Sequence, residues 1–130
     1  MTGRPPRKGP AANEDLRSAL QSAIREHGFV YGLLADPDGQ ILAEGGDPER
    51  LRWQGRRTRL FGTAKDIRDL NDSLDGRILP AIKAQGEVVC ALARPTDRIL
   101  LALFHQDGRS DPDVSKEVEQ LSQELARLLA

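Results

Sequence analysis

The sequence contains little of what characterises several large classes of protein. Among its 130 residues it has a single cysteine, Cys90, so neither an internal disulfide nor a cysteine-based metal cluster is expected. Aromatic residues make up only 4% of the chain, so its core must be built mainly from Leu, Ile, Val and Ala. The longest apolar run, Ile99 to Phe104, is far shorter than the roughly 20 residues that cross a bilayer.

An excess of charge of one sign is also missing. Lys and Arg number 19 against 20 Asp and Glu, which gives a formal net charge of -1. A protein dedicated to binding the DNA backbone usually has a strong basic excess, so nucleic acid is not the expected partner. We expect a soluble, cytoplasmic domain. Because a chain of this length buries only about 65–70% of its unfolded surface, an oligomer would stabilise it further.

The composition divides the chain into a short tail and one domain. Residues 1–12 are rich in proline, glycine and cations, which predicts a disordered basic tail. The tail is either solvated or contacts an acidic partner. Residues 13–130 are expected to form a single domain, because a chain of this length has no room for two.

Hydrophobic periodicity predicts eight elements in the order α-β-β-α-β-β-β-α. The expected helices run from Asn13 to Gly28, from Leu60 to Leu74 and from Asp111 to Leu128, with Asn13 and Asp111 as N-caps. The expected strands are Phe29 to Ala35, Ile41 to Ala43, Ile78 to Ile82, Val88 to Ala93 and Ile99 to His105. Short connections make the sheet mostly antiparallel, so the fold class is α+β, with three helices layered on a five-stranded sheet.

Turn residues refine this outline at three places. Asp36 to Gly39 predicts the turn of a hairpin, because Pro37 presets φ and Gly39 accepts a positive φ. Asp47 and the proline after it predict a short helical turn that contains Trp53. Pro80 predicts that the third strand lies at the sheet edge or begins there, since proline donates no ladder hydrogen bond.

No combination of residues predicts catalysis, so we expect neither an enzyme nor a bound metal or cofactor. His27 is interpreted as a cation at the negative end of the first helix. His105, at the end of the last strand, is interpreted as solvent-facing or locally bonded. Cys90 lies in mid-strand, where apolar burial makes a thiol inert. Asp36 and Asp38 fit a turn better than a calcium loop, because the spacing of ligands fails after Gly39.

The most unusual local feature is a cluster of arginines in the connector before the second helix. Arg50, Arg52, Arg56, Arg57 and Arg59 lie within ten residues around Trp53. Arginine and tryptophan are the residues most enriched at binding hot spots. The cluster either contacts an acidic partner or a phosphate group, or forms a solvated loop that pairs with nearby carboxylates.

Two hairpins and the order of elements carry a family resemblance. The first hairpin, from Tyr31 to Ala43, has an apolar strand, an Asp-x-x-Gly turn and a return strand of small residues. Gln85 to Val89, followed by Arg98 to Phe104, is similar to a paired fourth and fifth strand. Over residues 13–129 the chain thus resembles the roadblock (dynein light-chain 7) family, whose fold is of the roadblock/profilin-like type.

The resemblance implies a function that composition does not. Members are non-catalytic and bind or regulate Ras-like small GTPases in signalling and cell polarity, some as GTPase-activating proteins, or serve as scaffold subunits. They dimerise, with themselves or with a paralogous roadblock subunit, through their third strands and second helices. Here the implied dimer interface is Leu60, Ala64, Ile67, Asn71, Leu74, Ile78, Pro80 and Ile82.

The implied partner-binding surface combines the arginine connector with the second helix. Its residues are Arg52, Trp53, Arg56, Arg57, Arg59, Lys65 and Arg68. The second helix departs from the family here, because many members have alanine and glycine where this chain has charged residues. A second interpretation is a small-ligand sensing module of the profilin-like or PAS/GAF kind. It would need an internal apolar pocket near Tyr31, Cys90 and His105.

Overall fold

The structure, a computed structural model, describes residues 10–50, 52–53, 56–57, 63–85, 88–97, 99–106 and 110–129. Its helices are α1 (Pro10–His27), α2 (Ala64–Asp72) and α3 (Asp111–Leu129). Its strands are β1 (Tyr31–Ala35), β2 (Ile41–Gly46), β3 (Arg52–Trp53), β4 (Arg56–Arg57), β5 (Ala81–Gln85), β6 (Val88–Thr96) and β7 (Ile99–His105). A 3-10 turn, Pro48–Arg50, precedes β3.

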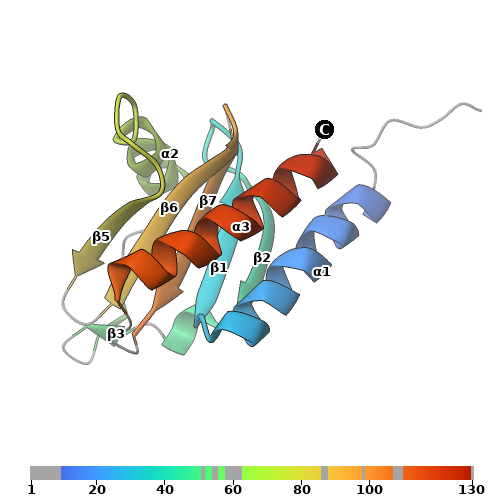
Figure 1. Ribbon diagram of the computed structural model, residues 1–130. Coiled ribbons are helices and arrows are strands. Elements are labelled where there is room, and N and C mark those ends of the chain that lie inside the picture. The colour runs from blue at the N-terminus through green and yellow to red at the C-terminus, as the bar shows by residue number, and fades with distance from the viewer. Residues whose placement is uncertain are drawn as a thin grey trace, which may run out of the picture.

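The main sheet confirms the predicted fold class. Its five strands lie in the order β2-β1-β7-β6-β5, and every neighbouring pair is antiparallel. α1 and α3 lie side by side over one face, and α2 lies on the other (Figure 1). The strands β2 and β5 are therefore the two edges of this sheet.

The face under α1 and α3 is closed by aliphatic packing. Leu20 of α1 and Leu125 of α3 are fully buried against Leu101 and Leu103 of β7. The buried residues of α3, which are Val114, Val118, Leu121 and Leu125, thus pack on this chain's own sheet. Gly28 ends α1 as predicted, with a φ of 75° that favours glycine.

The opposite face is covered in part by the much shorter helix α2. Its Ile67 and Leu70, with Leu74 just beyond its end, pack in one buried cluster with Tyr31 and Phe104. The β1–β2 turn closes as predicted, since the Gly39 amide donates to the Asp36 carbonyl at 3.0 Å and Gly39 has a φ of 90°.

The helix boundaries differ from the predicted ones at their starts. α1 already begins at Pro10, so Asn13 lies within the helix and is not its N-cap. α2 begins at Ala64, not Leu60, because Thr63 and Asp66 form a capping box. α3 is preceded by Ser110, whose hydroxyl accepts from the Asp113 amide at 3.3 Å, so the N-cap lies one residue before Asp111.

Three strand predictions also need correction. Trp53 lies in the β3–β4 hairpin rather than in a helical turn. The predicted strand from Ile78 begins only at Ala81, directly after Pro80, and forms the edge strand β5. β6 continues to Thr96, because its pairing with β7 shifts register between Ala93 and Thr96, where a proline is tolerated.

Candidate functional site

The residues proposed for an internal ligand pocket are packed within the core. Tyr31, Cys90 and His105 are all buried, so the solvent-facing interpretation of His105 is wrong. The Tyr31 hydroxyl donates to Glu44 at 2.7 Å, and burial together with this bond raises the pKa of Tyr31. Burial likewise raises the pKa of the Cys90 thiol and keeps it protonated. This arrangement favours structural roles for these side chains.

His27 lies at the end of α1, as predicted, and it also contacts a second helix. Its Nδ1 atom lies 2.6 Å from Glu117 Oε2 of α3. Within the described residues, no group of three His, Cys, Asp or Glu side chains is arranged to hold a metal ion. No helix in those same ranges is long and apolar enough to span a membrane.

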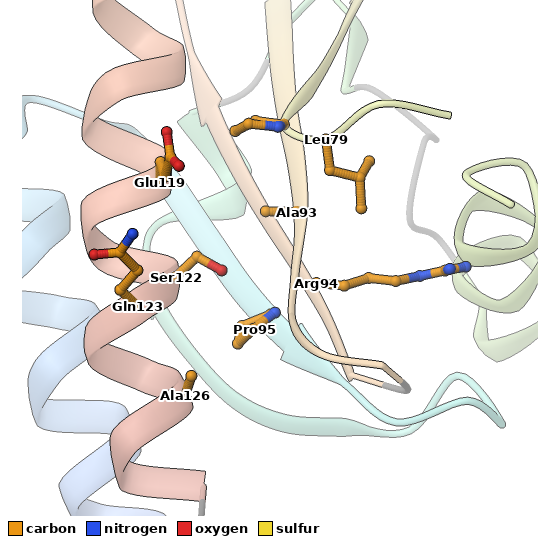
Figure 2. A pocket seen from close by; sticks show the side chains of 9 residues that line it. Leu79, Ala93, Arg94, Pro95, Glu119, Ser122, Gln123 and Ala126 are labelled. Atoms are coloured by element: carbon orange, nitrogen blue, oxygen red, sulfur yellow. The ribbon is translucent and has the colours of Figure 1, made fainter. Parts of the chain in front are cut away.

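Two shallow surface grooves flank the helices α1 and α3. One, of about 250 Å³, lies between α3 and the strand β6, and is drawn in Figure 2. Glu119, Ser122, Gln123 and Ala126 of α3 line one wall, whereas Arg94 extends away from α3. The other, of about 290 Å³, lies beside β2 and Arg17 of α1. Tyr31, Cys90 and His105 line neither groove.

The α2 side of the sheet is built differently, with polar contacts at both helix ends. At the start, the Asp66 amide donates to Thr63 Oγ1 at 3.1 Å, and the Thr63 amide donates to Asp66 Oδ2 at 3.0 Å. At the end, Arg94 of β6 donates from Nε to Asn71 Oδ1 at 2.8 Å. These contacts fix where α2 sits on the sheet.

The Arg94 guanidinium makes two more bonds around the end of α2. Its Nη2 donates to the Asn71 carbonyl at 2.6 Å and to Asp75 Oδ1 at 2.8 Å. Asn71 is a buried polar residue, 5% exposed, so these bonds supply partners that the apolar surroundings do not. A cation at the C-terminal end of a helix also interacts favourably with the helix dipole.

The free edge of β5 lies next to this helix. Lys83 of β5 donates from Nζ to Ser73 Oγ, the C-cap of α2, at 3.5 Å. The other side of β5 pairs with no strand among the described residues. Just before β5, Ile78 is 92% exposed, which is unusual for a large aliphatic side chain. An unpaired edge beside an exposed isoleucine is typical of a surface that another chain covers.

Comparison with known proteins adds structural relatives only, since no family model and no curated protein matches the sequence. An MglB with a tetrameric arrangement matches with a TM-score of 0.72 and 19% identity, covering 92% of this chain and 91% of that one. Gliding protein MglB from Thermus thermophilus matches with a TM-score of 0.72 and 20% identity, covering 92% of each chain. A Roadblock/LC7 domain from Streptomyces avermitilis matches with a TM-score of 0.61 and 11% identity, covering 87% of this chain and 96% of that one.

The chain has the roadblock/LC7 fold. The related layered protein profilin IA of Acanthamoeba castellanii matches with a TM-score of 0.57 at 11% identity. Since one fold can host unrelated functions, the fold alone does not assign one.

On this roadblock fold the predicted partner-binding residues separate into two groups. Arg52, Trp53, Arg56 and Arg57 form the β3–β4 hairpin, in which Arg52 pairs with Arg57 and Trp53 with Arg56. Lys65 and Arg68 lie exposed on α2. Figure 1 places β3 at the end of the sheet away from α2, so the two elements that carry these residues lie apart. Arg59 lies outside the described residues.

The residues predicted for the dimer interface also lie in different surroundings. Ile67, Asn71 and Leu74 are buried within this chain, and Pro80 and Ile82 are half-buried. Ala64 and Ile78 are exposed, and Leu60 lies outside the described residues. The available surface on this side of the roadblock fold is therefore the outward face of α2, Ile78 and the β5 edge.

The start of α2 could have been predicted from a sequence pattern, whereas the contacts of Arg94 could not. Pro95 directly after Arg94 favours a turn, so the pattern gives no sign that Arg94 holds α2 from within β6. The start of α2 does have a signal that sequence reasoning missed, because Thr63 and Asp66 stand at capping-box spacing.

Proposed function

We propose that this chain is a non-catalytic regulator or adaptor that dimerises and binds a Ras-like small GTPase. The observation that carries this proposal is the match to gliding protein MglB, which covers 92% of both chains with a TM-score of 0.72. The hairpin resemblance in the sequence supports it independently, because the roadblock family binds such GTPases. The buried state of Tyr31 and Cys90 gives no support to a ligand-sensing role.

Dimerisation is proposed along the β5 edge. A second copy that pairs with this edge would supply backbone partners on the side of β5 that pairs with no strand among the described residues, and would cover Ile78, which is 92% exposed. The joined sheet would then have both α2 helices on one face. The tetrameric arrangement of one MglB relative supports self-association as a property open to this fold. The second subunit is either this chain or a paralogous roadblock subunit.

The proposed GTPase-binding surface is the β3–β4 hairpin. Its four strand positions hold three arginines and the only tryptophan of the chain. Arginine forms paired hydrogen bonds with carboxylates, so an acidic surface on the GTPase is the expected counterpart. Because the hairpin and α2 lie at different ends of the sheet, Lys65 and Arg68 are not included in this surface.

Calorimetric titration tests the proposal. A Ras-like small GTPase from the same genome, loaded with GDP or with a non-hydrolysable GTP analogue, is titrated into the full chain. We expect binding in at least one nucleotide state. For Arg56→Ala with Arg57→Ala, we expect affinity lower by about tenfold or more, as for hot-spot residues. Absence of binding in both nucleotide states would overturn the proposed function.

A matched control separates the hairpin from general loss of charge. Arg17→Ala with Arg25→Ala removes two exposed arginines from α1 and should leave the affinity unchanged. If the hairpin variant and the α1 variant bind equally well, the hairpin is not the GTPase-binding surface.

A further inference from the structure

The register of the β3–β4 hairpin sorts its residues onto two different faces. Arg52 pairs with Arg57 and Trp53 with Arg56, in antiparallel strands. In such a ribbon, residues that pair share one face, and the next pair along lies on the other face. One face therefore has two arginines at directly opposed positions, and the other has the tryptophan and the third arginine. We call Arg52 and Arg57 the facing arginines.

The facing arginines are an unfavourable combination for a hairpin by itself. Directly opposed positions of an antiparallel pair have Cβ atoms about 5 Å apart, and like charges there destabilise the pairing. β3 and β4 have two residues each, and they form a sheet of their own within the described part of the chain. A ribbon of only two strands is marginally stable in water. The stability of the single chain therefore does not explain why both positions hold arginine.

The second pair of the hairpin is favourable by comparison. Arginine and tryptophan attract each other through the cation–π interaction, so Trp53 and Arg56 are compatible residues at opposed positions. The arginines of the hairpin are therefore not equivalent. Repulsion between like charges is expected on the face of Arg52 and Arg57, and not on the other.

An anion placed between the facing arginines would remove this repulsion. The guanidinium group presents its N–H donors in a planar fork, which suits a carboxylate or a phosphate. Hydrogen bonds between such charged groups are about twice as strong as those between neutral ones. An anion shared by two arginines would therefore both stabilise the hairpin and be bound tightly by it.

The distribution of charge along the chain favours a local anion over an extended anionic surface. The stretch from position 50 to position 59 has five arginines and no acidic residue, whereas the whole chain has a net charge of -1. The rest of the chain is therefore net negative. A membrane or a nucleic acid presents many phosphates, which would repel this remainder. A carboxylate that protrudes from a protein surface approaches the hairpin without that cost.

We propose that the facing arginines form a single binding site for a carboxylate of a protein partner, with Arg52 and Arg57 holding the same acidic side chain. Because both belong to the proposed GTPase-binding surface, this site rests on the proposed function and narrows it to one face of the hairpin. Arg56, on the other face, does not take part. The planar forks are essential to the site, so lysine at the same two positions is a poor substitute.

Titration of the full chain with a short polyglutamate peptide tests the site without the GTPase. Trp53 is the only tryptophan of the chain and is adjacent to Arg52, so its fluorescence reports on the hairpin. We expect saturable binding at low ionic strength, where exposed charges are least screened. Arg52→Gln and Arg57→Gln should each weaken it by about tenfold or more. The double variant should lose less than the product of the two single losses, because both arginines act on one anion.

Two matched variants separate the paired site from a general attraction of opposite charges. Arg56→Gln removes the same charge from the same hairpin, but from its other face, and should leave the affinity close to that of the wild type. Arg52→Lys with Arg57→Lys keeps both charges but loses the planar forks, and should weaken binding nearly as much as the glutamine variants. If the lysine variant binds like the wild type, or if Arg56→Gln is as damaging as Arg57→Gln, the paired site is overturned.

Hydrogen exchange of the free chain gives a readout that needs no ligand. Because the facing arginines repel each other, Arg57→Gln should slow exchange at the amides of β3 and β4, although it weakens binding. A purely structural role of Arg57 would have the opposite effect. Faster exchange in the variant would mean that a carboxylate of the same chain already neutralises the pair, which would overturn the proposed site.

The outcomes also separate this site from the proposed function. If the peptide binds as expected but Arg52→Gln leaves GTPase binding unchanged, the carboxylate site stands and the GTPase binds elsewhere. If GTPase binding is weakened equally by Arg56→Gln and Arg57→Gln, the proposed function stands and the paired site is overturned. Phosphatidylserine vesicles that bind the chain through Arg52 and Arg57, while the peptide does not bind, would overturn the choice of a carboxylate in favour of a phosphate.

Discussion

The two faces of the sheet are stabilised in different ways. The face under α1 and α3 is covered by helices of 18 and 19 residues whose leucines and valines close a continuous aliphatic layer. The opposite face has α2, with 9 residues, held by a capping box at its start and by Arg94 at its end. A short helix buries less apolar surface, so directional polar contacts must fix its position.

This difference suggests that the two sides of the sheet have different roles, one in stability and the other in recognition. On the side of α1 and α3, the apolar residues of the helices pack against the sheet, and charged residues of both signs are exposed to solvent. The α2 side adjoins an edge of β5 that pairs with no strand among the described residues, and an isoleucine that is 92% exposed. We therefore assign the fold's stability mainly to the first face, and we propose that assembly uses the second.

The largest expected effect tests the first face. Leu20→Ala removes a fully buried side chain between α1 and the sheet, and should lower the free energy of unfolding by about 2–5 kcal/mol. Chemical denaturation measures this loss, with Ser22→Ala on the exposed side of α1 as control. A loss no greater than that of the control would show that α1 contributes little to stability.

A smaller and more local effect is expected at Arg94. Arg94→Ala removes three hydrogen bonds and leaves the buried Asn71 short of partners, which should cost about 1–3 kcal/mol. Hydrogen exchange should quicken in the amides of α2 and stay unchanged in α1. Arg77→Ala, an exposed arginine of the following connection, serves as control. Equal acceleration in both helices would contradict the separate attachment of α2.

Tyr31 gives a pH-dependent test of the core under α2. Its folded-state pKa lies above its ordinary value of 10.0, mainly through burial and then through the bond to Glu44. The stability contribution is therefore fully present below pH 10 and is lost as the pH rises further. Phenolate absorbance should appear only together with unfolding, and Tyr31→Phe should weaken the alkaline loss of stability. Phenolate formation in the folded protein would contradict this.

The smallest effect is expected from the exposed ion pair of α2. Lys65→Ala removes the contact with Asp69, but both groups are solvated and such pairs add little to stability. The melting temperature of dilute protein, under conditions where it is monomeric, should therefore stay close to that of the wild type. A large drop would mean that this exposed pair supports the single chain.

Patterns of apolar residues predicted most of the fold, since burial itself creates those patterns. The hairpin turn at Asp36 and Gly39, the strand from Ile99 and the final helix were all placed correctly. The β3–β4 hairpin was missed, because two-residue strands rich in arginine have no apolar period to detect. The burial of His105 was missed for a related reason, since a polar residue at a strand end carries no pattern of its own.

The candidate site was less predictable than the fold. The sequence identified the charged second helix as a departure from the family that it resembles, but not which face of that helix points outward. That depends on Ile67 and Leu70 packing on the sheet and on Arg94 reaching across from β6. Such long-range contacts leave no local signal, so only the structure separates the hairpin arginines from Lys65 and Arg68.

The most direct test compares the two sheet edges within one molecule. Hydrogen exchange of the wild-type chain is measured over a range of concentrations, from dilute protein to well above the dimer dissociation constant. We expect amides of β5 and α2 to become more protected as concentration rises, while those of β2, the other edge, do not change. Protection that appears at β2 instead, or that is independent of concentration at β5, would contradict the assignment of assembly to the α2 side.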